Sequence, residues 1–309
     1  MNYIIKFLKA KYKNILFLFF IIAFSIFIFN NRKNLYDLLD FNFLNLSFLF
    51  VFFIITNLIK TKLNQYLYSI KNIDMSFLET LNLIIKSTAG NLATPFSLGT
   101  GYKFHYLKKK YNLSYSQNLN INLYFTIFTN IVYVFVMIVI SILVYIQGNS
   151  IYLNLIIFWS SVFFVGVILF YLLSKEYKFN KLKFLNSYSM QSSDLPLNGV
   201  INLIIFTSLL LFVNILSHIY LFRLLDLNIN TFQIVSYVCI SGLANLVKFT
   251  PGNFGINESV LIISNLHHGL APLEVILVSL IFRFFSWVNI LFFYAILNIQ
   301  KPYNKRAPK

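Results

Sequence analysis

The sequence has few charged residues: Asp, Glu, Lys and Arg make up 11% of the chain, against about 25% in soluble domains. Hydrophobic residues make up 58% of its 309 positions, and the mean hydropathy is +0.73. This composition excludes an ordinary soluble fold and places most of the chain in a lipid bilayer. The longest polar stretch, 174–197, is too short for a soluble catalytic domain. We therefore expect one transmembrane domain over 1–309, with a cytoplasmic linker at 174–198.

Cysteine and catalytic motifs are also scarce. Cys239 is the single cysteine, which excludes a disulfide within the chain, and no zinc-binding motif is present. The sequence contains no Walker phosphate loop, no dinucleotide fingerprint, no Gly-x-Ser-x-Gly elbow and no His-Glu-x-x-His pair. We expect no cofactor, no metal, no enzymatic activity and no ATP hydrolysis by the chain itself.

Acidic residues are few in relation to basic ones, 9 against 25, and the formal net charge is +16. In a soluble protein this excess would indicate a nucleic-acid partner. Here the basic residues gather between apolar runs, where they orient a membrane protein toward the cytoplasm and contact anionic lipid. We expect a multi-pass protein of the cytoplasmic (inner) membrane with both termini in the cytoplasm and no nucleic-acid partner. The basic clusters lie within 6–13, 60–71, 103–110, 175–183 and 301–309.

Apolar runs of about 20 residues can cross the membrane as helices. The expected fold class is accordingly an all-α polytopic membrane protein with about six full spans, at 15–30, 41–59, 121–146, 151–173, 199–222 and 274–298. Two further apolar segments, 76–100 and 232–268, are interrupted by proline, glycine and charged residues. Neither segment has the pattern of one uninterrupted span.

The two interrupted segments carry similar motifs, at 91–99 and 245–255. Each begins Asn-Leu and contains a proline followed four residues later by a glycine. Such a pair in repeat-like halves, here about 41–146 and 199–298, indicates a transporter's binding site. The basic clusters place both flanks of the first segment inside and both flanks of the second outside. This predicts two opposed re-entrant helical hairpins in an inverted repeat; the alternative is eight plain spans with two kinked helices.

Charged residues inside apolar segments are candidates for function. Lys86, Lys248 and Arg283 are the basic ones, and Glu79 and Glu258 are acidic. The basic side chains, together with free amides at a helix start, would suit a phosphate headgroup. Two structural alternatives stay open: a buried Glu258–Arg283 pair that fixes helix register, and a Lys86 side chain that reaches the cytoplasmic surface.

Three stretches, 91–103, 242–258 and 271–284, resemble a known family, the transmembrane flippase domain of lysylphosphatidylglycerol synthases and its stand-alone relatives. Asn253 replaces a second glycine of the family pattern, and Asn257 replaces a frequent arginine. Thr100 stands where relatives often carry an acid, which disfavours a cationic headgroup. The residues that fall on the downstream pattern are Pro251, Gly252, Gly255, Glu258 and Arg283.

The resemblance implies a lipid or lipid-linked-precursor translocase that binds an anionic headgroup, either of a phospholipid or of a polyprenyl phosphate. The aminoacyltransferase domain of full-length relatives is not found here. Alternatives are a non-catalytic membrane partner of a separate glycosyltransferase or lipid synthase and, less favoured, a small-solute transporter. The residues expected to bind substrate are Lys86, Asn91, Lys103, Asn245, Lys248, Glu258 and Arg283. Those expected to shape the backbone are Pro95, Gly99, Pro251, Gly252 and Gly255.

Overall fold

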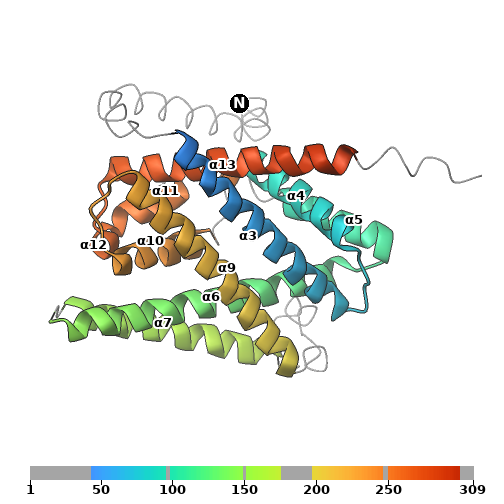
Figure 1. Cartoon of the computed structure of the whole chain (residues 1–309). Helices are drawn as coiled ribbons and strands as arrows, with labels where there is room; N and C mark the ends of the chain where they lie inside the picture. Colours follow the sequence, from blue (N-terminus) through green and yellow to red (C-terminus); the bar gives the residue numbers. More distant parts are fainter. Residues whose placement is uncertain (1–42, 95–97, 149–150, 175–196, 246–249, 300–309) are drawn as a thin grey trace, which may run out of the picture.

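The computed structural model describes residues 43–94, 98–148, 151–174, 197–245 and 250–299, and all regular elements in these ranges are helical (Figure 1). The expected all-α class is confirmed. The elements are α3 (Phe43–Ser69), α4 (Phe77–Ala93), α5 (Leu98–Tyr111), α6 (Tyr115–Ile146), α7 (Ile151–Ser174), α9 (Leu197–Leu224), α10 (Thr231–Ala244), η3 (Pro251–Asn253), α11 (Ile256–Ile263), α12 (Asn265–His268) and α13 (Pro272–Ile299).

Four of the described helices are long and apolar enough to cross a membrane. They are α3, α6, α9 and α13, and they coincide with the runs expected at 41–59, 121–146, 199–222 and 274–298. The run expected at 151–173 is helix α7, whose part at Leu153–Ile168 forms a shorter apolar helix. The run at 15–30 lies outside the described residues, as does most of the linker.

The long helices pack against both interrupted segments. Helix α3 packs on both α9 and α4, and α13 packs on α3 and α4 (Figure 1). Helix α6 pairs with α7 and also contacts α9 and α10. The segments that carry the repeated motif therefore lie among helices from both halves of the chain.

Both interrupted segments form packed helical pairs. In the first, α4 ends at Ala93, where Thr94 has an extended backbone, and it packs closely against α5. In the second, α10 packs on α11 across a break that includes η3. Whether either pair is re-entrant stays a prediction, but each contains a helix break where the proline and glycine pattern placed one.

Several helices extend beyond the limits expected from hydropathy. Helix α3 continues to Ser69, α6 begins at Tyr115, and α5 runs through the basic stretch as far as Tyr111. Polar end caps explain part of this difference, because a side chain that accepts from free backbone amides starts a helix in polar sequence. The side chains of Ser114 and Gln117 form such a capping box at the start of α6.

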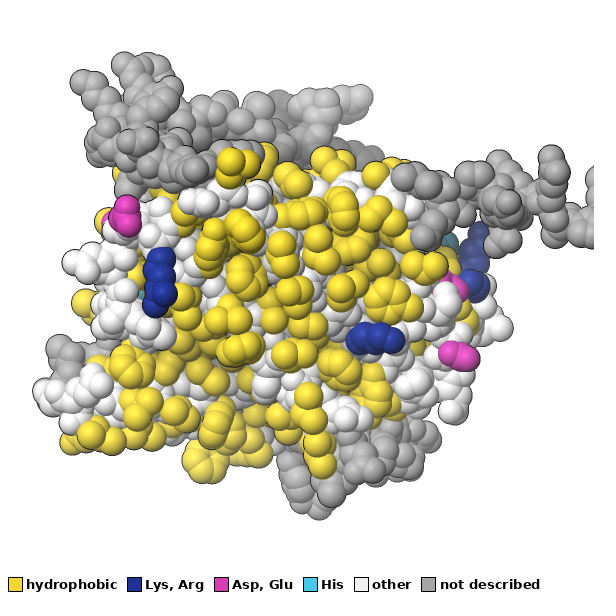
Figure 2. Space-filling model, viewed as in Figure 1, with side chains coloured by type: hydrophobic (Ala, Val, Ile, Leu, Met, Phe, Trp, Pro, Cys, Tyr) yellow, Lys and Arg dark blue, Asp and Glu magenta, His cyan; other side chains and the backbone are white. Residues whose placement is uncertain are grey.

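The outer surface is apolar. Figure 2 shows hydrophobic side chains over most of one face, with isolated Lys, Arg, Asp and Glu side chains on it. Phe164 on α7 and Leu291 on α13 are examples, exposed by 66% and 63%. A surface that exposes large apolar side chains on adjacent long helices suits contact with lipid tails. The multi-pass membrane character expected from composition is thus supported by the fold.

Candidate functional site

The break after α4 is held by a side chain on each of its two helices. Asn91 Oδ1 accepts a hydrogen bond from the backbone N–H of Thr100 at 3.0 Å, and Asn91 Nδ2 donates to Thr100 Oγ1 at 3.2 Å. Asn91 lies on α4 and Thr100 on α5. The asparagine of the repeated motif thus connects the two arms of the first helical pair.

Gly99 lets these two helices touch through their backbones. A Cβ atom at Gly99 would lie 1.9 Å from the carbonyl oxygen of Ser87 and 2.6 Å from the amide nitrogen of Asn91. Both of these atoms are backbone atoms and cannot rotate away. Any side chain at position 99 would therefore force α4 and α5 apart.

The second break depends on backbone conformations that glycine adopts readily. Gly252 has φ 55° and Gly255 has φ 82°, and Asn253 between them has φ 59°. Positive φ is open to glycine and tolerated by asparagine. Pro251 opens the short helix η3, and Gly255 is the residue that precedes α11. The pattern of proline and glycine thus turns the chain between α10 and α11.

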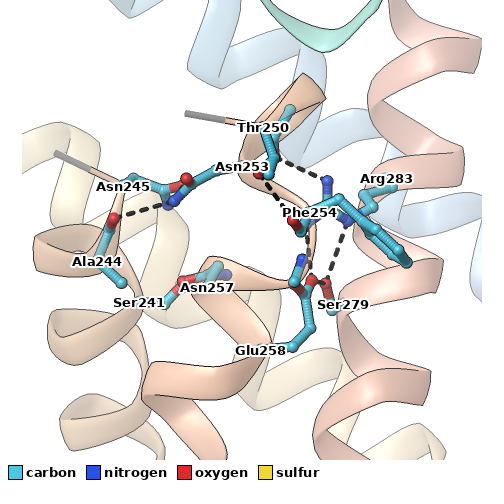
Figure 3. A network of polar contacts seen from close by, with 12 residues as sticks. Ser241, Ala244, Asn245, Thr250, Asn253, Phe254, Asn257, Glu258, Ser279 and Arg283 are labelled. Carbon is cyan, nitrogen blue, oxygen red and sulfur yellow. Dashed lines mark hydrogen bonds and ion pairs between the residues drawn. The ribbon is translucent and has the colours of Figure 1, made fainter. Parts of the chain in front are cut away.

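Asn253 is fixed by the end of α10. Its Nδ2 donates to the carbonyl oxygen of Ala244 at 2.9 Å and to Asn245 Oδ1 at 3.4 Å (Figure 3). Asn253 is 5% exposed, whereas Asn245 is exposed at the end of α10. The asparagine that replaces the family's second glycine therefore satisfies a helix-terminal carbonyl that an apolar side chain would leave unpaired.

Glu258 and Arg283 form the centre of the network in Figure 3. Arg283 Nη2 donates to Glu258 Oε1 at 2.6 Å, and Ser279 Oγ donates to the same oxygen. The other carboxylate oxygen of Glu258 accepts from the backbone N–H of Gly255 at 2.6 Å. The side chain of Glu258 is 7% exposed and that of Arg283 is 20% exposed. The Glu258–Arg283 ion pair considered from the sequence is therefore present and largely buried.

Arg283 also holds the backbone of the break. Its Nη1 donates to the carbonyl oxygen of Gly252 at 2.7 Å, and its guanidinium lies 4.8 Å from the ring centroid of Phe254. Since Arg283 belongs to α13, it joins this helix to η3 and to α11 at once. We refer to Gly252, Gly255, Glu258, Ser279 and Arg283 as the clasp.

The two breaks meet at the clasp. Helix α4 packs on η3, and a Cβ at Gly252 would lie 3.0 Å from Leu92 Cδ2 and 3.0 Å from Arg283 Nη1. Leu92 is the second residue of the first repeated motif. The motif copies from the two halves of the chain are therefore in direct contact, which a sequence pattern alone does not establish.

The other expected site residues lie outside the clasp. Lys103 is 9% exposed on α5, where its Nζ donates to Asn122 Oδ1 of α6 at 2.9 Å. Lys86 is half-buried on α4, and no residue in the described ranges pairs with it. Lys248 and Pro95 fall outside the described residues. The structure thus unites Glu258, Arg283, Gly252 and Gly255 and leaves the two described lysines apart from them.

Sequence reasoning missed Ser279. It lies on α13 one turn before Arg283, whose Nε is 3.3 Å from its hydroxyl oxygen. The four-residue spacing of Ser279 and Arg283 could have predicted their contact, because side chains four residues apart on a helix share one face.

Glu79 fastens the first helical pair at the end opposite to its break. From the first turn of α4 it accepts hydrogen bonds from Tyr106, Lys110 and Tyr111 of α5, at 2.7, 2.7 and 2.6 Å. Burial acts to raise the pKa of Glu79, but the hydrogen bonds from Lys110, Tyr111 and Tyr106 outweigh it and the pKa is lowered. Glu79 lies outside the four candidate spans.

A comparison with protein families gives a match over nearly the whole chain. The family model described as the lysylphosphatidylglycerol synthase TM region matches residues 4–293 of the 309. This match confirms the resemblance carried by the motifs. Comparisons with curated proteins and with solved structures give no match.

Proposed function

This chain belongs to the lysylphosphatidylglycerol synthase transmembrane-region family, and from this premise we propose that it translocates a lipid or lipid-linked precursor across the cytoplasmic membrane. The substrate carries an anionic headgroup, as in an acidic phospholipid or a polyprenyl phosphate. The headgroup binds close to the meeting point of the two helix breaks. Both termini lie in the cytoplasm, and the chain itself catalyses no covalent step.

The contact between the two breaks carries this proposal. Leu92 and Gly252 bring together the interrupted helices of the two halves. Irregular backbone at membrane depth is tolerated where it is buried in protein or lines a polar cavity, and transporters place substrate sites at such broken helices. A surplus of basic residues and a scarcity of acids favour an anionic substrate over a cationic one.

The clasp has a positioning role in this mechanism. Each charge of the Glu258–Arg283 pair is already satisfied by the other and by neighbouring backbone. The pair therefore holds η3, α11 and α13 in place, and the anion contact falls to other groups, among them Lys86 and Lys248.

A reconstitution assay tests the proposal. The full chain is placed in vesicles that contain a fluorescent acidic phospholipid or a fluorescent polyprenyl phosphate, and a membrane-impermeant quencher reports the fraction of probe in the outer leaflet. We expect the quenched fraction of an anionic probe to exceed one half only when the protein is present. We expect a zwitterionic probe to cross the membrane more slowly. If neither anionic probe moves and the chain instead co-purifies with a glycosyltransferase or lipid synthase, the partner role replaces the translocase role.

A further inference from the structure

A polar cavity lies between the long helices, away from the charges of the clasp. Its volume is about 100 Å³, and it is bounded by α3, α4, α9 and α13. A water molecule takes up about 30 Å³ in the liquid, so this space holds about three waters or one group of similar total size. The polar residues that decide its chemistry are Asn57, Lys60, Thr88, Asn214, Ser286 and Asn289.

The charge of the lining favours an anion. Lys60 is the one charged residue among the residues that line the cavity, and no acidic side chain is among them. The remaining polar groups are amides and hydroxyls, which can donate to an oxyanion without a change of protonation. Phe52, Phe53 and Phe282 form the apolar part of the wall.

A buried amide in this lining has an unused donor. Asn289 is 0% exposed, and its Oδ1 accepts a hydrogen bond from Asn57 Nδ2. Its own Nδ2 has no hydrogen-bond partner in the described part of the chain. Buried polar groups in native proteins are nearly always hydrogen-bonded, so this donor on a residue of the cavity wall is available to an acceptor, whether water or an oxyanion.

Two of the helices that line this cavity, α4 and α13, also take part in the junction of the two breaks. Phe282 and Ser286 lie on α13 on either side of Arg283 in the sequence. Thr88 lies on α4 about one turn before Leu92, the residue that contacts Gly252. The cavity therefore adjoins the junction of the two breaks although it shares no charged residue with the clasp.

We propose that this cavity is the site that binds the phosphate of the translocated headgroup. Lys60 supplies the positive charge, and Asn289 Nδ2 with the Thr88 and Ser286 hydroxyls supplies the directional donors. This assignment rests on the proposed function, and it places the anion between α3, α4, α9 and α13, not on the Glu258–Arg283 pair.

The test compares variants of the full chain in nanodiscs made of zwitterionic lipid. The probes are short-chain phosphatidylglycerol and, separately, inorganic phosphate. Lys60→Gln removes the charge at nearly constant size, and Thr88→Val removes a hydroxyl at constant shape. Lys62→Gln is the matched control, because Lys62 lies on the same helix but over the ring of Phe77, and it does not line the cavity.

We expect Lys60→Gln to weaken phosphatidylglycerol binding about tenfold, as loss of a charge-assisted contact does. Thr88→Val should weaken it less, and Lys62→Gln should leave it unchanged, with all three melting at the wild-type temperature. If inorganic phosphate displaces phosphatidylglycerol, the cavity recognises the phosphate group itself. If phosphatidylglycerol binds and inorganic phosphate does not displace it, the cavity recognises the whole headgroup.

The assignment is overturned if Lys60→Gln and Thr88→Val bind phosphatidylglycerol as the wild type does, or if the wild type binds neither probe. Translocation by the same samples separates this result from failure of the proposed function. Wild-type translocation with unaffected cavity variants overturns the cavity and leaves the translocase intact. Binding that needs Lys60, with no translocation by the wild type, supports the cavity and overturns the translocase.

Discussion

Leu92 and Gly252 touch although 160 positions separate them: a Cβ on Gly252 would lie 3.0 Å from Leu92 Cδ2 and 3.6 Å from Leu92 Cα. One residue belongs to the helix break in the first half of the chain and the other to the break in the second half. A side chain at position 252 would press on Leu92 and Arg283, and one of them would have to shift. The two copies of the repeated motif are therefore parts of one structural centre.

Gly252→Ala should destabilise the protein. The residue has φ 55°, a conformation that costs a non-glycine residue about 1–2 kcal/mol, and the new methyl group would also press on Leu92 and Arg283. Thermal unfolding in detergent measures the loss. Gly148→Ala is the control for conformation alone, because Gly148 has φ 96° and nothing within 4 Å of its Cβ position. An equal effect at both positions would argue against a tight contact between the breaks.

The Glu258–Arg283 pair should behave as a coupled unit. Glu258→Gln or Arg283→Leu alone should cost about 3–5 kcal/mol, because the remaining charge is buried without its partner. The double variant should recover part of this loss, but not all of it, since Gly255 N–H and the Gly252 carbonyl lose their partners too. A double-mutant cycle on unfolding free energies measures the coupling. Additive single effects would show that the pair is not coupled.

Lys86→Gln should reduce translocation and leave stability near that of the wild type. The side chain has no partner among the described residues, so its removal strands no buried charge. The comparison is Lys109→Gln, an exposed lysine on α5 that should change neither property. Lower expression of Lys86→Gln with unchanged transport would make Lys86 a structural residue.

Acid should loosen the first helical pair through Glu79. Because the pKa of Glu79 is lowered from its usual 4.5 in the folded protein, its contribution to stability is fully present above pH 4.5. That contribution is lost as the pH falls further, through the lowered pKa that Glu79 has in the folded protein. Hydrogen exchange of the α4 and α5 amides between pH 7 and pH 3 should show protection falling in this acid range. Glu79→Gln should remove this part of the pH dependence, and its persistence would assign the effect to another group.

Reporter fusions test the topology. A fusion at Gly148, just after α6, should place the reporter outside, and a fusion at the C-terminus should place it in the cytoplasm. Alkaline phosphatase activity and green fluorescence respectively report these two sides. A C-terminal reporter on the outside would rule out the inverted arrangement of the two halves.

The sequence was sufficient for the all-helical class, for the four candidate spans of the described residues and for helix breaks within the two interrupted segments. Apolar runs reveal a membrane helix because the bilayer demands internal backbone hydrogen bonds, and proline and glycine mark where the helix stops. Helix ends were less predictable, because α5 continues through Lys108 to Lys110, which hydropathy assigns to a loop. The cavity could not be predicted: Asn57 and Asn289 are far apart in sequence, and only the packing of α3 on α13 brings them together.

The α4–α5 pair is fastened at both of its ends, by Glu79 with the last turn of α5 and by Asn91 with Thr100. At the break end, Gly99 also brings the backbones of the two helices into close contact. We therefore expect the two helices to move as one unit, because contacts at both ends hold them to each other. If the proposed translocation moves this pair relative to η3, the contact between Leu92 and Gly252 is one that has to change.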